Sequence, residues 1–188
     1  MTRTPMVWNA ANIVTLVRFL LVPLVVVAVL LDDGGGGWRW VAAALFLLAA
    51  ATDRLDGWLA RRTGQVTDWG KLVDPIADKA LVGAALITLS ALGDLPWWVT
   101  VVILVRELGV TALRFAVLRY TVIAASPGGK AKTVLQTAGI AVFLLPLASL
   151  PTAVTVVGWV LISAAVLLTV VTGVDYLRRG LAVRAAAS

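Results

Sequence analysis

The sequence predicts an all-α integral membrane protein with six transmembrane helices. Of its 188 residues, 61% are hydrophobic and only 14% are charged, and the mean hydropathy is +0.97. Apolar runs close to the ~20 residues that a helix needs to cross a bilayer recur along the chain. No run alternates polar and apolar residues in the way that a transmembrane β-barrel requires. The composition therefore favours lipid as the environment of most of the chain.

The six apolar spans belong to one domain that covers residues 1–188. The second span is short, but it reaches membrane length if its helix continues through Asp53 and Arg61. Residues 1–12 are expected to form a juxtamembrane segment at the interface, and residues 177–188 a tail. The predicted spans are 13–31, 38–52, 72–92, 97–118, 133–150 and 154–176.

Basic residues gather in alternate loops, and this asymmetry orients the helices. The opposite loops hold one base, Arg39, against three aspartates. By the positive-inside rule, both termini and the loops after the second and fourth spans are cytoplasmic. A net charge of +6 suits loops that face anionic headgroups, so we expect no nucleic-acid partner. The cytoplasmic bases are Arg3, Arg61, Arg62, Lys71, Arg119, Lys130, Lys132, Arg178, Arg179 and Arg184.

The chain contains neither cysteine nor histidine. Their absence excludes disulfides, thiolate nucleophiles and zinc–cysteine sites, and it removes the most common general base. Any acid–base or metal chemistry must therefore use carboxylates. Oxygen ligands favour hard cations such as Mg²⁺ or Mn²⁺.

Four aspartates are placed to meet at the cytoplasmic boundary. Asp53 and Asp56 are three residues apart at the end of the second span, and Asp74 and Asp78 are four apart at the start of the third. On helices, each spacing places both side chains on one face. Four adjacent carboxylates would repel one another unless divalent cations, such as a pair of Mg²⁺ or Mn²⁺ ions, neutralised them. The alternative is a belt of salt bridges with nearby Arg and Lys residues, which we expect for Asp68.

This segment resembles the signature of the CDP-alcohol phosphatidyltransferase family. The resemblance implies a site for two Mg²⁺ or Mn²⁺ ions on the four aspartates, with Asp78 also acting as the catalytic base, and a homodimeric protein. It implies that CDP contacts Asp53, Asp56, Gly57, Ala60, Arg61, Gly70, Asp74 and Thr15. The matching pattern is Asp53-x2-Asp56-Gly57-x2-Ala60-Arg61-x8-Gly70-x3-Asp74-x3-Asp78.

Basic residues outside this signature are candidates for binding the phosphate of an acceptor. Ionisable residues within membrane spans are costly, which makes a functional role the default interpretation. The alternatives are a buried pair of Glu107 with Arg106 or Arg114, snorkelling of Arg18 to the interface, and a plain cytoplasmic loop for the lysines. The candidates are Arg18, Arg106, Arg114, Lys130 and Lys132.

Three further patterns resemble the branch of the family whose acceptor is sn-glycerol 3-phosphate. The resemblance covers about residues 9–140 and departs at Ala11, where the branch usually has proline before the asparagine. It implies transfer of the phosphatidyl group from CDP-diacylglycerol to glycerol 3-phosphate at the cytoplasmic face of a bacterial plasma membrane, among membrane lipids. The patterns are Asn12-x2-Thr15-x2-Arg18-x4-Pro23, Arg106-Glu107 with Arg114, and Gly129-Lys130-x-Lys132-Thr133-x2-Gln136.

Other functions remain open at this point. Within the family, inositol phosphate or phosphatidylglycerol would give phosphatidylinositol phosphate or cardiolipin from the same chemistry. From a different class, a cation or proton transporter could use the same aspartates. A transporter is expected to hold its ligands near the midplane beside broken helices, whereas these aspartates lie at one boundary.

Overall fold

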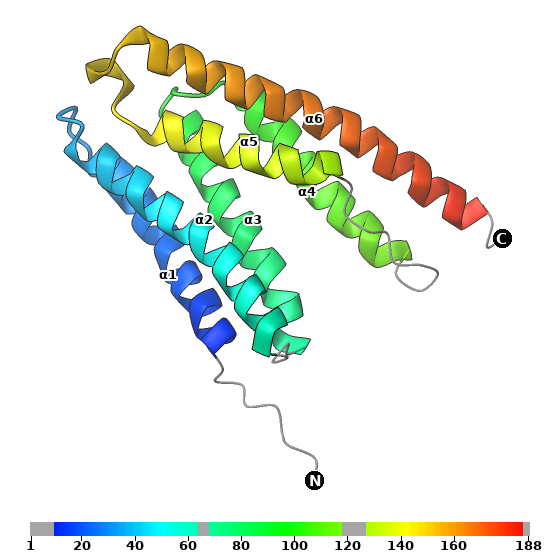
Figure 1. The fold of residues 1–188 in the computed structure, drawn as a ribbon. Coiled ribbons are helices and arrows are strands. Elements are labelled where there is room, and N and C mark those ends of the chain that lie inside the picture. The colour runs from blue at the N-terminus through cyan, green and yellow to red at the C-terminus, as the bar shows by residue number, and fades with distance from the viewer. Residues whose placement is uncertain (1–9, 64–67, 118–126, 186–188) are drawn as a thin grey trace. The chain divides into compact units, whose positions relative to one another are not determined.

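The computed structural model describes residues 10–63, 68–117 and 127–185 (Figure 1). Side chains are described for 15–52, 76–113 and 128–178. Within these ranges the chain forms six α-helices, one 3₁₀ turn and no strand, which confirms the all-α prediction. The elements are α1 (Ala10–Leu30), α2 (Gly37–Thr63), α3 (Asp68–Ala91), α4 (Trp97–Val117), α5 (Pro127–Leu144), η1 (Leu147–Ser149) and α6 (Thr152–Ala185).

Most helix boundaries lie within four residues of the predicted spans, and the larger differences are at the end of the second helix, at both ends of the fifth and at the end of the last. The second helix continues to Thr63, as its short apolar run required. The fifth helix begins at Pro127 rather than at residue 133. The fifth ends at Leu144 rather than at 150, because Pro146 has no N–H group and disfavours helical backbone in the preceding residue. The last helix extends to Ala185, so most of the predicted tail 177–188 is helical. Its Leu, Ala and Arg residues are strong helix formers.

Many large hydrophobic side chains are exposed on the described parts of the helices. One helical segment, Thr152–Arg178, is long and apolar enough to cross a bilayer, and Thr15–Leu30 and Gly37–Thr52 are shorter apolar helices. Large hydrophobic side chains such as Leu20, Val105 and Leu167 are exposed, whereas several polar side chains are buried. Apolar surface on this scale is costly in water and suits contact with lipid.

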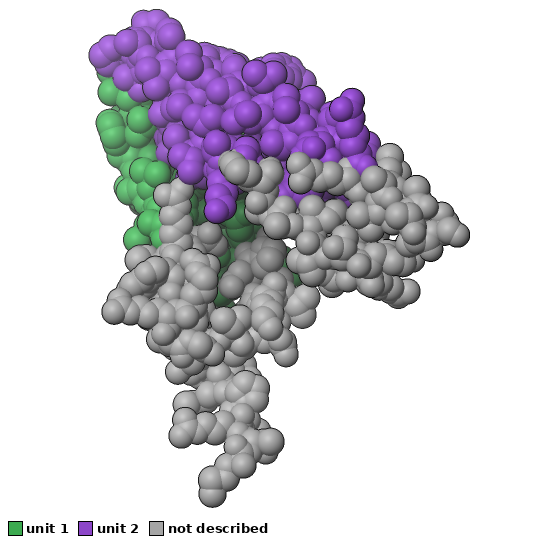
Figure 2. All heavy atoms as spheres, turned by 45° about the vertical axis from the view of Figure 1, so that its right-hand side comes forward, with its two compact units in different colours: residues 1–89, 144–150 green, residues 90–143, 151–188 purple. Residues whose placement is uncertain are grey.

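The chain divides into two compact units (Figure 2). The first consists of Met1–Leu89 and Leu144–Leu150. In it α1 and α2 lie side by side, joined by the turn 31–36 (Figure 1). The α1 face buries residues at helical spacing, and α2 contributes small alanines that allow a close approach. The buried apolar residues of these two helices are Leu21, Val25, Ala28, Val29, Ala42, Ala43, Phe46 and Ala49.

The glycine run 34–37 makes the turn between α1 and α2 possible. Gly34 and Gly36 have positive φ angles of 91° and 76°, which side-chain-bearing residues rarely adopt. A Cβ atom on Gly36 would also lie only 2.6 Å from Cβ of Pro146. Gly36 is therefore required both by the backbone and by the segment that follows α5.

The second unit consists of Ser90–Phe143 and Pro151–Ser188. Here α4 packs on α6, and α5 approaches α6 closely at two glycines. A Cβ on Gly139 would lie 3.1 Å from the backbone nitrogen of Ile162, and one on Gly158 would lie 2.9 Å from the Val142 side chain. Small residues permit such backbone approach between membrane helices. Phe143 and Trp159 add an edge-to-face contact at 5.3 Å.

Candidate active site

The four aspartates of the signature all lie on helices of the first unit. Asp53 and Asp56 lie in α2, and Asp74 and Asp78 lie in α3. Helical backbone confirms the premise of the spacing argument, because residues three or four apart share a face. Four residues separate α2 from α3, so the two helix ends are at most roughly 18 Å apart.

Of the four aspartates, Asp78 is the one whose side chain is described, and it is half-buried beside the fully buried Ala77. The paired helical positions and an all-oxygen donor set fit Mg²⁺ or Mn²⁺. The remaining predicted ligands of the metals and of CDP fall where side chains are outside the described residues. These are Asp53, Asp56, Gly57, Ala60, Arg61, Gly70 and Asp74.

Thr15 and Arg18 lie on the buried face of α1, with 1% and 0% of their surface exposed. Complete burial of Arg18 differs from the snorkelling arrangement, which would leave its guanidinium in water. The turn 31–36 makes α1 and α2 antiparallel (Figure 1), so residues equally far from the turn lie at the same level. This places Thr15 and Arg18 beside the stretch from Ala49 to Thr52, directly before Asp53. The helix arrangement thus brings both residues to the level of the aspartate-bearing end of α2.

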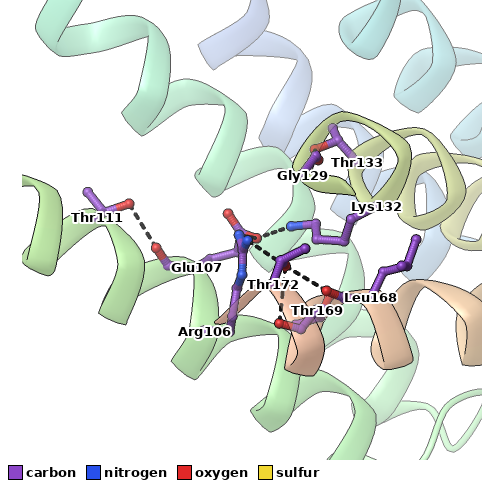
Figure 3. Close-up of polar contacts among 9 residues, drawn as sticks. All are labelled: Arg106, Glu107, Thr111, Gly129, Lys132, Thr133, Leu168, Thr169 and Thr172. Atoms are coloured by element: carbon purple, nitrogen blue, oxygen red, sulfur yellow. Dashed lines mark hydrogen bonds and ion pairs between the residues drawn. The ribbon is translucent and has the colours of Figure 1, made fainter. Parts of the chain in front are cut away.

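Three charged residues form a network in the second unit (Figure 3). One carboxylate oxygen of Glu107, Oε1, accepts a hydrogen bond from Arg106 at 3.1 Å and is also paired with Nζ of Lys132. Lys132 is only 3% exposed. The pairing of Arg106 with Glu107 was one of the alternatives that the sequence left open, whereas the pairing of Lys132 was not anticipated.

The last helix contributes a second set of partners. The other terminal nitrogen of Arg106 donates to the Thr172 hydroxyl at 2.9 Å, and that hydroxyl donates to the Leu168 carbonyl at 2.6 Å. The guanidinium carbon of Arg106 also lies 5.8 Å from the ring centre of Tyr176, within range of a cation–π interaction. The network therefore joins α4, α5 and α6 (Figure 3).

Lys130 and Lys132 occupy opposite faces of α5. Residues two apart on a helix are rotated by about 200°, and Lys130 is exposed where Lys132 is buried. Within the described part of the chain, Lys130 forms no hydrogen bond or ion pair. The side chain of Arg114 is outside the described residues. Among the candidate bases whose side chains the structure describes, Lys130 is the exposed one, and it is available to a ligand.

A groove of about 470 Å³ lies between α4 and α6 and is almost entirely apolar. Its polar lining consists of Arg106 and Thr169, beside residues such as Val105, Gly109 and Gly173. An apolar groove of this kind does not suit a charged, water-soluble acceptor. The polar network and the exposed Lys130 are therefore the more informative features of this unit.

Comparison with known proteins bears on the aspartate segment directly. The sequence profile described as CDP-alcohol phosphatidyltransferase matches residues 8–171. The chain belongs to this family. The match includes the whole aspartate signature and extends into α6, beyond residue 140 where the resemblance was expected to end. The protein is therefore a phosphatidyltransferase of a membrane-enzyme family.

Several bacterial relatives are similar over most of the chain. The probable phosphatidylglycerophosphate synthase of Mycobacterium tuberculosis is 56% identical over 92% of this chain and 82% of the relative. The CDP-diacylglycerol–glycerol-3-phosphate 3-phosphatidyltransferase of Bacillus subtilis is 44% identical over 71% and 70% of the two chains. The enzyme of that name from Rickettsia bellii is 34% identical over 90% and 94%.

For this CDP-alcohol phosphatidyltransferase, sequence reasoning overlooked the polar residues of the last helix. Thr169, Thr172 and Tyr176 were treated as part of a generic span, yet all three are buried. Their spacing of three and four residues was a usable signal, because it places polar groups on one face of an otherwise apolar helix. Such a stripe in a membrane span indicates a polar partner on a neighbouring helix.

Proposed function

We propose that the protein transfers the phosphatidyl group of CDP-diacylglycerol to sn-glycerol 3-phosphate, which gives phosphatidylglycerophosphate and CMP. The observation that carries the proposal is the complete aspartate signature, placed on α2 and α3 as two helical pairs. Relatives that cover 90% or more of this chain carry names for this reaction or its product. A phosphorylated acceptor also suits the exposed base Lys130 better than an uncharged alcohol would.

The four aspartates would hold two Mg²⁺ or Mn²⁺ ions. When bound, such ions neutralise the diphosphate of CDP-diacylglycerol and stabilise CMP as it leaves. Gly57 and Ala60 leave space along α2 for the nucleotide, because neither has a large side chain. The remaining proposed CDP contacts are Asp53, Asp56, Arg61, Gly70, Asp74 and Thr15.

Asp78 accepts the proton of the acceptor's 1-hydroxyl group as the reaction proceeds. The hydroxyl oxygen attacks the phosphorus that carries diacylglycerol, and the bond from that phosphorus to the oxygen of CMP breaks. A free carboxylate is a weak base for an alcohol. The proton therefore passes to Asp78 late, after the new phosphorus–oxygen bond has begun to form. The acceptor's phosphate is held by bases drawn from Lys130, Arg114, Arg106, Lys132 and Arg18.

We place this site at the cytoplasmic boundary of a bacterial plasma membrane, in a homodimer whose subunits each cross the membrane six times. The exposed apolar faces of the helices support this arrangement. The alternating loop charges support cytoplasmic termini. At this boundary the acyl chains of CDP-diacylglycerol remain in lipid while glycerol 3-phosphate arrives from the cytosol.

The test is to identify the lipid product. Purified protein receives labelled CDP-diacylglycerol and Mg²⁺, with glycerol 3-phosphate, inositol 1-phosphate or phosphatidylglycerol in separate reactions. We expect phosphatidylglycerophosphate from the first reaction and little product from the others. Cardiolipin or phosphatidylinositol phosphate as the main product would replace the proposed acceptor, and no CMP release from any mixture would reject the reaction class.

Removing a candidate phosphate-binding base should weaken acceptor binding selectively. For Lys130→Ala and Arg114→Ala we expect the KM for glycerol 3-phosphate to rise about tenfold or more, with less than about threefold change for CDP-diacylglycerol. The physical reason is the loss of one charge-assisted hydrogen bond to phosphate. Initial rates measured while each substrate is varied in turn provide the check. Equal increases in both KM values would show that these bases do not distinguish the acceptor.

A further inference from the structure

The start of α5 is attached to both neighbouring helices in the second unit. Pro127 opens the helix, and a Cβ atom on Gly128 would lie 3.1 Å from the Thr172 methyl group, so α5 touches α6 there. Four residues later, on the same face, Lys132 is paired with Glu107 of α4. Lys130 lies between these two attachments in the sequence, and it points away from them.

Glu107 is the centre of this attachment. Its Oε1 atom forms ion pairs with two cations, Arg106 and Lys132. The exposed fraction of the side chain is 13% for Arg106, 3% for Lys132 and 17% for Glu107. Charges so far removed from water require a counter-charge. With one negative and two positive groups, the three residues together carry a charge of +1. Removing Glu107 would raise this to +2 without any gain in hydration.

Arg106 is fixed from the side of α6 as well. Thr172 accepts its hydrogen bond, and a Cβ on Gly173 would lie 3.2 Å from Cγ of Arg106, so the backbone of α6 packs against the arginine side chain. Arg106 cannot turn toward a substrate without leaving these partners. Lys132 is similarly committed, since reaching a soluble phosphate would require it to leave Glu107 and a buried position.

We infer that Glu107 is a positioning residue, which holds Lys132 and with it the first turn of α5, so that Lys130 is presented to the acceptor's phosphate. In this arrangement Arg106 and Lys132 belong to the support and do not contact the acceptor. The inference rests on the proposed function for the identity of the acceptor, and it narrows the proposed set of phosphate-binding bases.

The ion pair itself is tested without any activity measurement. Purified variants are compared by their thermal unfolding midpoint in detergent. We expect Glu107→Gln to lower the midpoint by roughly 5–10 °C, because two buried cations lose their counter-charge. The double variant Glu107→Gln/Lys132→Met restores the charge of +1, and it should recover at least half of that loss. A double variant no more stable than Glu107→Gln alone would overturn the pairing.

The positioning role is tested by a cycle with Lys130. We expect Glu107→Gln to raise the KM for glycerol 3-phosphate about tenfold when Lys130 is present, and to have less than about threefold effect in a Lys130→Met background. If Glu107→Gln raised the KM for glycerol 3-phosphate by the same factor in both backgrounds, Glu107 would not act through Lys130. Lys132→Met breaks the same attachment, so it should raise the KM for glycerol 3-phosphate about as much as Glu107→Gln does, and likewise only when Lys130 is present. A tenfold rise that persisted in the Lys130→Met background would make Lys132 an acceptor ligand itself and overturn the inference.

A milder variant guards against loss of folding. Thr172→Val keeps the side-chain shape and removes the hydroxyl that accepts from Arg106, while Thr172→Ser keeps the hydroxyl. Thr172→Val should raise the KM for glycerol 3-phosphate several-fold, whereas Thr172→Ser should keep it near the wild-type value. Equal KM values for the two variants would contradict the role of Thr172 in holding Arg106. If the wild-type protein made no product from glycerol 3-phosphate, the proposed function would fail, and the unfolding midpoints would still decide the ion pair.

Discussion

Replacing Asp78 with asparagine should reduce turnover by at least about 10³-fold. Asparagine has nearly the same shape as aspartate, but it cannot accept the acceptor's proton and is a poorer ligand for a hard cation. Asp78 is half-buried in the middle of a helical turn of α3, so the exchange should leave folding intact. The measurement is CMP release from CDP-diacylglycerol by the purified variant, together with its thermal unfolding midpoint.

Asp68→Asn is the matched control for this prediction. It removes the same charge from the first residue of α3, which lies outside the signature. We expect activity within about threefold of the wild type. The folded state should also be little affected, because an acidic group in a first helical turn contributes only modestly to stability. Binding of CDP-diacylglycerol should persist in the Asp78 variant. Turnover by Asp78→Asn at near wild-type rates would remove Asp78 as the base, whatever its effect on stability.

The helices were largely predictable because each depends on local sequence. The apolar run of the second span was too short for a membrane by itself, and a helix that continues through Asp53 and Arg61 was the condition under which it would be long enough; α2 meets this condition. The end of α5 was predicted wrongly because hydropathy counts Pro146 and its neighbours as apolar, whereas the backbone cannot remain helical there. The glycines 34–37 indicated a turn, but their contact with Pro146 joins residues more than a hundred positions apart.

In the candidate site, too, the part that depends on local sequence was predictable and the part that depends on packing between helices was not. The aspartate pattern lies within one stretch of 26 residues, so helical spacing was sufficient to group it. Arg106, Lys132 and their partners are spread over three helices, α4, α5 and α6, and no local pattern specifies which face of α5 packs against α4. Sequence reasoning therefore placed Lys130 and Lys132 in one role, whereas burial assigns them to opposite faces.

Removing divalent cations with EDTA should stop CMP release, and adding Mg²⁺ or Mn²⁺ in excess should restore it. Without a cation, the diphosphate of CDP-diacylglycerol would have to approach four carboxylates of like charge, which is strongly unfavourable. The chain supplies no histidine or cysteine that could hold a softer metal instead. Calcium is expected to compete with Mg²⁺ without supporting turnover, because its longer and more variable coordination suits the transition state less well.

A variant distinguishes cations held by the protein from cations that merely accompany the substrate. Asp56→Asn removes one proposed ligand, so the Mg²⁺ concentration that gives half-maximal activity should rise about tenfold or more, beyond any change in maximal rate. If the cation travelled only with the diphosphate, this concentration would stay at the wild-type value. CMP release that continued in EDTA at the wild-type rate would contradict the metal proposal altogether, and it would favour the alternative in which nearby Arg and Lys residues offset the charge of the aspartates.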